Sequence, residues 1–469
     1  MPFVNDRQKC AHLLRRFGLG ASEAELDFYL KSGFNGAIEM LLNYDQIDEA
    51  FPVPVETFKN PKQNRVPMQG VSTWWALRMM MTRRPLQEKM TLFWHNHFAT
   101  SASKVTAPML MYGQNEIFRR NAIGNFRNLL SEVSKDPAMI LWLDSQQNVK
   151  GHANENFARE VMELFTLGIG HYSEKDIQEG ARAFTGWSIR RTTDPATKAV
   201  TASFVDRPGR HDEGSKTFLG SSGNFNGDDV LNILCDQPRT AEFIAWKMWS
   251  WFGYLNPEPK LIQRLASKFH QSGMEIKVLL REMMTAPEFF SHKAERSVFK
   301  NPADVCITTL RQLGVGELVG DAFRSSALGV LPAGRAAPAG AAAAAMKAMG
   351  MWLLYPPDVS GWKFGPAWIS SATMVERMAW ADQLFGQSQS TKLRFRIPAF
   401  ALLSRDTTPR GVTATILSAF DASLNREKVA VLVKTAEKAS DGELTPENAG
   451  RTAAAVCRLL FASPEFQMM

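Results

Sequence analysis

The chain has 469 residues, of which 45% are hydrophobic and 22% are charged, so composition excludes a mostly disordered protein and indicates a sizeable core. The formal net charge is +7 and the pI is about 9.2. Basic residues occur as scattered pairs, such as Arg15–Arg16 and Arg190–Arg191, rather than as one stripe. This distribution argues against a nucleic-acid-binding protein.

Four cysteines lie far apart, at Cys10, Cys235, Cys306 and Cys457, with no CxxC spacing. Such spacing indicates reduced thiols rather than a disulfide framework or a thiolate zinc site. The first ten residues contain no apolar signal-peptide segment, and the later apolar runs are too short or too interrupted to span a membrane. We therefore expect a cytoplasmic protein without a transmembrane segment.

Helical periodicity dominates the chain from its beginning. Residues 21–44 predict two short amphipathic helices separated at Gly33, the first of them capped by Ser22 with Glu25 three residues later. A loop is expected over roughly 52–68, and helical patterns return after it.

The pattern changes between about residues 184 and 220, where short segments rich in β-branched and aromatic residues alternate with glycine and proline. We predict a mainly α fold, a large multi-helical domain with a small β-hairpin or three-stranded insert around 184–220. The low-complexity segment 332–346 suggests a boundary. The main helical domain would cover 1–330, and residues 331–469 would form a C-terminal helical part that packs on it or continues it.

Two histidines stand one residue apart in "FWHNHFAT", residues 93–100. On a continuous helix His95 and His97 would point about 200° apart and could not share a metal ion. If the helix ends near Trp94, the two imidazoles of an extended segment would face the same side and could chelate together. The weak helix propensity of residues 98–101 favours that early end, and the alternative is that both histidines pack in the core.

A second polar group lies in "NENFAREVMELFTLG", residues 154–168. At helical spacing Asn156, Glu160 and Glu163 form one stripe, which could hold a hard cation or place a general base. The same stripe could instead be a solvated face, on which Arg159 pairs with glutamates four residues away.

Two loops offer further candidates. "GRHDEGSKTFLG", residues 209–220, supplies His211, Asp212 and Lys216, although aspartate and glycine are also ordinary turn residues. The segment 355–380 begins with Pro-Pro and contains Asp358 and Trp362, which fit either a loop over a pocket or a packed connector.

Several strings, in this order, resemble the bacterial "domain of unknown function 1800" family over about residues 11–466. These strings are "AHLLRRFGLGAS", "LQEKMTLFWHNHFATS", "NENFAREVMELFTLG", "YSEKDIQEGARAFTGW", "HDEGSKTFLG", "LYPPDVSGWKFGPAWISSATMVERMAW" and "ASPEF". The chain departs from the family pattern at Val161, where leucine is usual, and in its Ala-rich segment 332–346. The resemblance implies no reaction, but it favours a shared polar site.

Members of that family are often encoded beside a second family whose proteins carry export signals. The resemblance therefore implies an export context, and a protein encoded nearby as a partner.

These observations lead to the hypothesis of a metal-dependent hydrolase acting on a polar or anionic substrate. Imidazoles and carboxylates would bind a divalent metal ion. The catalytic residues would include a general base and a cation, and other residues would contact the substrate. The candidates are His95, His97, Glu160 and His211 for the metal, Glu163, Asp212 and Lys216 for catalysis, and Arg159, Asn156, Asp358 and Trp362 for the substrate. The alternative is a non-catalytic helical protein that binds a polymer such as a glycan, or a partner protein, with its tryptophans and the 355–370 loop.

Overall fold

The computed structural model describes residues 3–49, 51–326, 331–332, 334–387 and 395–469. In these ranges helices dominate and the strands form only two small sheets, which confirms the mainly α fold. The helices of the N-terminal part are α1 (Asp6–Phe17), α2 (Glu23–Leu30), α3 (Gly33–Leu42), α4 (Met68–Met81), α5 (Pro85–His97), α6 (Pro108–Arg120), α7 (Phe126–Ser134), α8 (Pro137–Trp142), α9 (Asn156–Glu160) and α10 (Glu174–Ala183).

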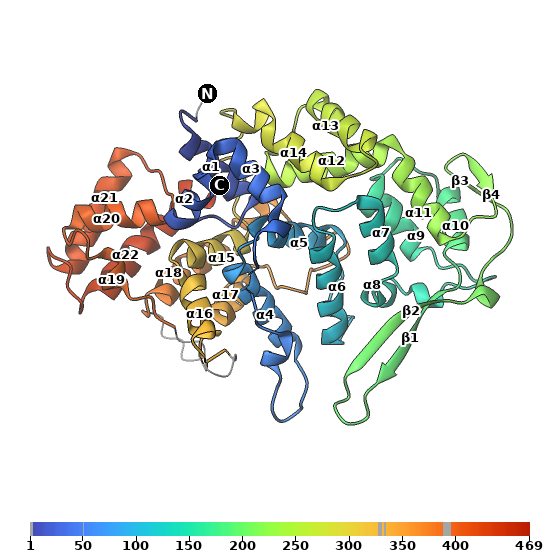
Figure 1. Ribbon diagram of the computed structural model, residues 1–469, viewed down its shortest axis with the longest axis horizontal. Coiled ribbons are helices and arrows are strands. Elements are labelled where there is room, and N and C mark those ends of the chain that lie inside the picture. Colours follow the sequence, from blue (N-terminus) through green and yellow to red (C-terminus); the bar gives the residue numbers. More distant parts are fainter. Residues whose placement is uncertain (1–2, 50, 327–330, 333, 388–394) are drawn as a thin grey trace.

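The second part of the chain adds twelve α-helices within the described ranges. They are α11 (Gly227–Asp236), α12 (Pro238–Phe252), α13 (Pro259–Gln271), α14 (Ile276–Thr285), α15 (Pro302–Gln312), α16 (Val315–Arg324), α17 (Ala337–Ala348), α18 (Ser371–Leu384), α19 (Ala399–Leu403), α20 (Pro409–Ala419), α21 (Arg426–Ser440) and α22 (Ala449–Ala462). In Figure 1 the helices α19–α22 lie at one end of the molecule and α9–α11 at the other.

Short helical turns connect these elements. The 3₁₀ turns are η1 (Tyr44–Gln46), η2 (Val55–Phe58), η3 (Ser145–Gln147), η5 (Pro208–Arg210), η6 (Pro287–Phe290), η7 (Gly365–Trp368) and η8 (Glu465–Gln467). The element η4 (Val161–Thr166) is a π-helix that continues α9. Single π turns within helices are rare and are often found at functional sites.

The two short helices expected near the N-terminus are α2 and α3. Ser22 caps α2 in the expected way, because its Oγ accepts from the Glu25 backbone N–H (3.2 Å) while the Glu25 carboxylate accepts from the Ser22 N–H (3.1 Å). The capping box therefore satisfies two N–H groups that the first turn of a helix leaves without partners.

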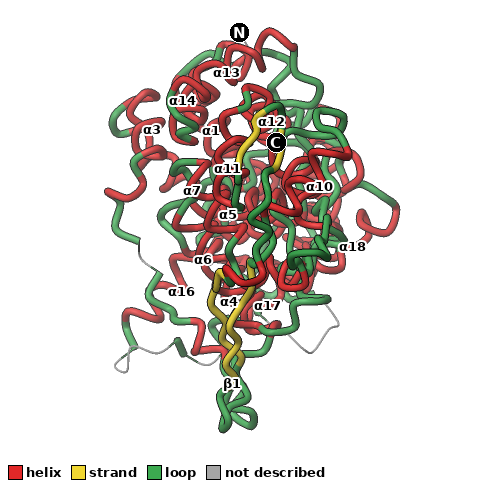
Figure 2. Tube along the Cα trace, turned by 90° about the vertical axis from the view of Figure 1, so that its right-hand side faces the viewer, coloured by secondary structure: helices red, strands yellow, loops and turns green. Residues whose placement is uncertain are grey.

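The expected β insert is present as two antiparallel hairpins. Strands β1 (Trp187–Thr193) and β2 (Val200–Asp206) pair along their whole length, and the shorter β3 (Lys216–Phe218) and β4 (Ser221–Gly223) form the second hairpin. The first three residues of β1 are buried, β1 is exposed from Arg190 onward, and the far end of the hairpin projects from the molecule, as Figures 1 and 2 show.

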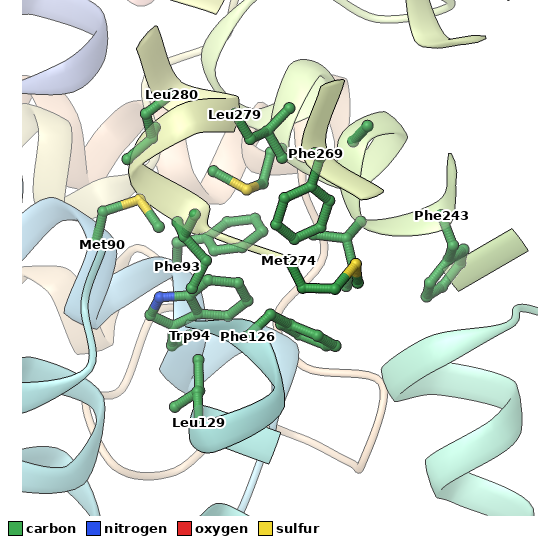
Figure 3. Close-up of a cluster of buried hydrophobic side chains, with 14 of the residues drawn as sticks. Met90, Phe93, Trp94, Phe126, Leu129, Phe243, Phe269, Met274, Leu279 and Leu280 are labelled. Atoms are coloured by element: carbon green, nitrogen blue, oxygen red, sulfur yellow. The ribbon is translucent and has the colours of Figure 1, made fainter. Parts of the chain in front are cut away.

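The hydrophobic side chains gather in two clusters. The first contains side chains of α1–α3, α5 and α7 together with α9–α14, and the second contains side chains of α4 and α15–α22. Figure 3 shows part of the first cluster, where Phe93 and Trp94 of α5 meet Phe126 of α7 and Phe269 of α13. The second cluster joins the early helix α4 to the C-terminal helices, and the boundary expected near residue 330 stays a prediction.

Helix α5 lies between the two clusters and is buried on all sides. Of its 13 residues, Asn96 is the one that is not fully buried. Phe93 and Trp94 belong to the first cluster, and Leu92 belongs to the second. A helix in this position must bury its polar side chains too, so Lys89 forms a buried ion pair with Asp304.

Candidate functional site

A narrow crevice lies where the last turn of α5 meets α12 and the loop between α17 and α18. It contains two small hollows of about 40 and 20 Å³, which share Ser250, Trp251 and Phe364. The larger hollow is lined by Phe93, Asn96, His97, Trp246, Lys247, Ser250, Trp251 and Phe364. We call this feature the α5–α12 crevice. Because such volumes admit only a few water molecules, a larger ligand would lie across its mouth.

Two aromatic side chains of the crevice are open to solvent. Trp246 of α12 is 41% exposed and Phe364 of the loop is 45% exposed. Within the described ranges, Phe28 is the one other aromatic residue among the large hydrophobic side chains that are exposed. Exposed aromatic side chains concentrated in one place indicate a binding surface.

Lys247 and His97 connect the crevice to the π-helix η4. The Lys247 ammonium donates to the Leu164 carbonyl oxygen (3.2 Å), and burial lowers its pKa to about 8. His97 Nε2 lies 3.1 Å from the Phe165 carbonyl oxygen, and because a carbonyl oxygen only accepts, Nε2 must hold the proton. His97 Nδ1 is then an unprotonated, buried acceptor that finds no partner among the described residues.

Asn96 fixes the loop over the end of α5. Its side-chain Oδ1 accepts from the Trp362 backbone N–H at 2.6 Å. The loop backbone comes so close that a Cβ atom on Gly361 would lie 2.4 Å from the Asn96 carbonyl oxygen, and Gly361 also has a φ of +87°. Glycine is therefore required at this point. The contact places the Trp362 ring beside the His95 ring, with 5.3 Å between their centroids.

Glu160, at the end of α9, feels the charge of two other carboxylates, Glu163 of η4 and Asp358 of this loop. Burial raises the pKa of Glu160, and repulsion from the Glu163 and Asp358 carboxylates raises it further, while Arg159 lowers it. Glu163 accepts a hydrogen bond from the Tyr172 hydroxyl, with 2.6 Å between the oxygens. Glu163 and Asp358, both chosen from the sequence, thus lie close enough to Glu160 for their charges to add to the effect of burial on its pKa.

The expected end of α5 near Trp94 is wrong, because the helix continues to His97. His95 and His97 therefore project in different directions, as a continuous helix requires. His95 lies among the rings of Trp75, Phe118 and Trp362. Burial lowers its pKa to about 3, and neither ring nitrogen has a hydrogen-bond partner in the part of the chain described.

The group at residues 211–216 is a tightly bonded turn beside α10. The Asp212 carboxylate accepts from the Arg182 Nε at 2.8 Å, and this bond chiefly lowers the pKa of Asp212 to about 2. Lys216 is buried and its ammonium donates to the backbone oxygens of Asp212 and Gly214. His211 Nδ1 lies 2.9 Å from the Thr185 carbonyl oxygen. Each of these polar groups already has a protein partner that holds the turn in place.

The other residues expected to contact the substrate lie in different places and do not form one group. Arg159 forms the predicted pair with Glu155 (3.2 Å), but its other partner is Glu174 (2.9 Å) rather than Glu163. Asn156 is exposed at the start of α9 and Trp362 is buried. Within the described ranges, no three or more His, Cys, Asp or Glu side chains form a group that could hold a metal ion. The metal ion expected from the sequence stays a prediction.

Sequence reasoning missed Trp246, Lys247 and Phe364, which line the crevice. The helix sequence "AEFIAWKMWSWF" contains a lysine among aromatic and aliphatic residues, and this isolated charge is the signal that could have singled out Lys247. No local pattern indicates that Phe364, more than a hundred residues later, would come to the same place.

Fold and site together define a multi-helical protein with an aromatic-flanked crevice and a neighbouring carboxylate group. The chain matches the model of the family described as "Protein of unknown function (DUF1800)" over residues 12–468, and it belongs to this family. No curated protein and no solved structure matches the chain. Across the described ranges, no helix is both long and apolar enough to cross a membrane.

Proposed function

We propose that the protein binds a polysaccharide chain across the mouth of the α5–α12 crevice. The observation that supports this proposal is the pair of exposed aromatic side chains, Trp246 and Phe364, which come from two different elements of the same crevice. Sugar rings offer apolar C–H faces that stack on aromatic rings, and their hydroxyl groups need polar partners at the edges.

The polar residues between the two aromatic side chains suit such a ligand. Lys247, Asn96 and Ser250 line the hollow beside them. Hydrogen-bond donors and acceptors therefore both line the mouth that a polysaccharide chain would cross. The hollow itself is too small for a sugar ring, which favours an extended polymer over a single sugar.

Affinity electrophoresis through gels that contain soluble neutral and uronic-acid polysaccharides tests this proposal. We expect one of these polymers to retard the protein, and we expect Trp246→Ala and Phe364→Ala each to weaken the interaction about fivefold, since an aromatic contact contributes about 1 kcal/mol. Phe28→Ala removes an aromatic side chain that is also 41% exposed but lies elsewhere, and should leave retardation unchanged. Retardation by none of the polymers, or equal losses in all three variants, would show the proposal to be wrong.

A second candidate function is hydrolysis of the bound chain, with Glu160 as proton donor. The observation in its favour is the raised pKa of Glu160, which burial and the neighbouring Glu163 and Asp358 produce. A raised pKa favours the protonated form of a carboxylic acid, which is the form that can protonate a leaving group. New reducing ends should then form with the wild-type protein and not with Glu160→Gln, while both are retarded equally in the gel. If the polymer binds but no new reducing ends form, the hydrolysis proposal is wrong and the binding proposal stands.

A further inference from the structure

Four basic side chains lie around the contact between the end of α1 and the segment 291–301. Arg15 and Arg16 belong to α1, and Arg296 and Lys300 belong to the segment. Arg16 is fully buried and Lys300 is 7% exposed, while the Arg15 and Arg296 side chains are 11% and 22% exposed. Burial is the main cause that lowers the pKa of Arg16, of Arg296 and of Lys300, and the positive charge of Arg15 lowers all three further.

The acidic residues nearby do not balance these charges. Asp421 receives hydrogen bonds from both Arg15 and Arg296. Asp304 is already paired with Lys89, and its second oxygen accepts from the Asn301 N–H (3.1 Å). Glu295 adds only a weaker attraction on Arg296. Two of the four cations thus have no acidic partner in the part of the chain that the structure describes, and an uncompensated buried charge is costly.

Of these four cations, Arg16 and Lys300 form no ion pair within the described ranges. Arg16 Nη2 donates to the carbonyl oxygens of Gly253 and Ala294 (2.6 Å for Ala294) and to Ser297 Oγ (3.2 Å), but its Nε and Nη1 are buried and find no acceptor among the described residues. The Lys300 ammonium lies 3.9 Å from the Phe466 ring centroid and has no hydrogen bond or ion pair within the described ranges. Burial chiefly lowers its pKa to about 7, and Arg296 lowers it further.

A fifth cation adds to the excess of positive charge. Arg377 of α18 is buried, and its two terminal nitrogens donate to the Lys300 carbonyl oxygen (2.8 Å) and to Gln467 Oε1 (2.7 Å), both of them neutral acceptors. The guanidinium therefore adds positive charge without an ion pair among the described residues. The region as a whole offers more donors and more positive charge than the protein's own acceptors satisfy.

We propose that Arg15, Arg16, Arg296 and Lys300 form a binding site for a small inorganic anion, in the chemical class of chloride and phosphate. The anion would accept hydrogen bonds from the free Arg16 nitrogens and from the Lys300 ammonium. It would supply the negative charge that Asp421 alone does not. Because the four side chains come from α1 and from the segment that follows η6, the anion would also hold these two parts of the chain together.

Line broadening of the ³⁵Cl resonance tests the site in the unaltered protein. We expect the folded protein to broaden the chloride line in a saturable way, and we expect phosphate to reverse the broadening if both anions share the site. Sodium gluconate at the same ionic strength should not reverse it, since that anion is too large for a buried cluster. Broadening that phosphate does not reverse contradicts a site shared by the two anions, and a chloride line that broadens no more than with unfolded protein contradicts the proposal as a whole.

Lys300→Met provides the matched variant. The substitution removes a cation that makes no hydrogen bond within the described ranges and keeps a side chain of similar length, so we expect a folded protein. It should bind chloride or phosphate at least tenfold more weakly and lose the rise in Tm that these anions give the wild type. Lys268→Met, at an exposed position of α13, is the control and should respond as the wild type does. Equal Tm responses of all three proteins would show that ionic strength, not a site, is responsible.

Discussion

The side chain of Asn96, at the end of the buried helix α5, accepts a 2.6 Å hydrogen bond from the backbone N–H of Trp362. This bond connects the last turn of α5 to the loop between α17 and α18, and the crevice opens beside this contact. Since Trp362 is buried, its N–H cannot turn to water when the acceptor is removed.

Asn96→Ala should therefore destabilise the protein by about 1–3 kcal/mol, the cost of leaving a buried donor without a partner. It should also weaken retardation by polysaccharide, because Phe364 is then no longer held in place. Asn96→Asp keeps the acceptor oxygen and is the control for the stability change. Urea denaturation of the three proteins provides the comparison, and equal midpoints for Asn96→Ala and the wild type would contradict this account of the loop.

Gly361 makes a second, independent prediction about the same contact. An alanine Cβ there would lie 2.4 Å from the Asn96 carbonyl oxygen at a φ of +87°, so the loop must move away from α5. We expect Gly361→Ala to lower the unfolding free energy by roughly 1–3 kcal/mol. Gly113→Ala in α6, where a Cβ meets open space, should instead raise it by about 0.5–1 kcal/mol. If both substitutions raise the unfolding free energy, the close contact at Gly361 does not destabilise an alanine there, and the prediction is wrong.

Local patterns predicted the helices well because their signals lie within a few residues of one another. The capping box of Ser22 and Glu25 is an example, since both partners belong to the same helical turn. The small β insert was also recognisable from its composition, because β-branched residues and turn residues alternate over a short range.

The site was predicted only in part because it depends on contacts between distant segments. Glu160 and Glu163 could be placed on one helix, and Asp358 joins them only in the folded chain. The end of α5 was misjudged for a similar reason. Local propensity favoured an early end, whereas burial between two cores keeps the helix intact through His97.

Asp136 predicts a loss of stability as the pH rises. This buried residue caps α8, where its Oδ2 accepts from the Met139 N–H (3.1 Å) and from Gln114 Nε2 (2.8 Å), and burial raises its pKa from 3.8 to about 7. The folded state thus holds the proton more tightly than the unfolded state does. The contribution of Asp136 is fully present below pH 4 and is lost as the pH rises towards 7.

Asp136→Asn keeps the cap but cannot ionise, so the comparison with the wild type isolates this effect. At about 1.4 kcal/mol for each pH unit between the two pKa values, the wild type should lose on the order of 4 kcal/mol relative to the variant between pH 4 and 7. Denaturant unfolding of both proteins over this range measures the difference. A difference that stays constant with pH would mean that the Asp136 carboxyl ionises as freely in the folded protein as in the unfolded chain.

His95 predicts the opposite dependence on pH. Its folded-state pKa is lowered from 6.5 to about 3 by burial, so the unfolded chain takes up a proton first as the pH falls. The wild type should lose stability between pH 6.5 and 3, by on the order of 5 kcal/mol over the full range, and His95→Leu should not lose this share. At pH 7 the leucine variant should be at least as stable as the wild type, because the imidazole it replaces has no partner within the described ranges.

The same variant tests whether His95 holds a metal ion. Unfolding of both proteins with and without a chelator should give equal shifts if His95 only packs against Trp75, Phe118 and Trp362. A chelator that lowers the Tm of the wild type alone would instead show that His95 is a ligand, because removal of a bound metal destabilises only the protein that binds it. A His97→Leu variant separates the two histidines. It should be destabilised by about 1 kcal/mol whether or not a chelator is present, since it loses the bond to the Phe165 carbonyl oxygen.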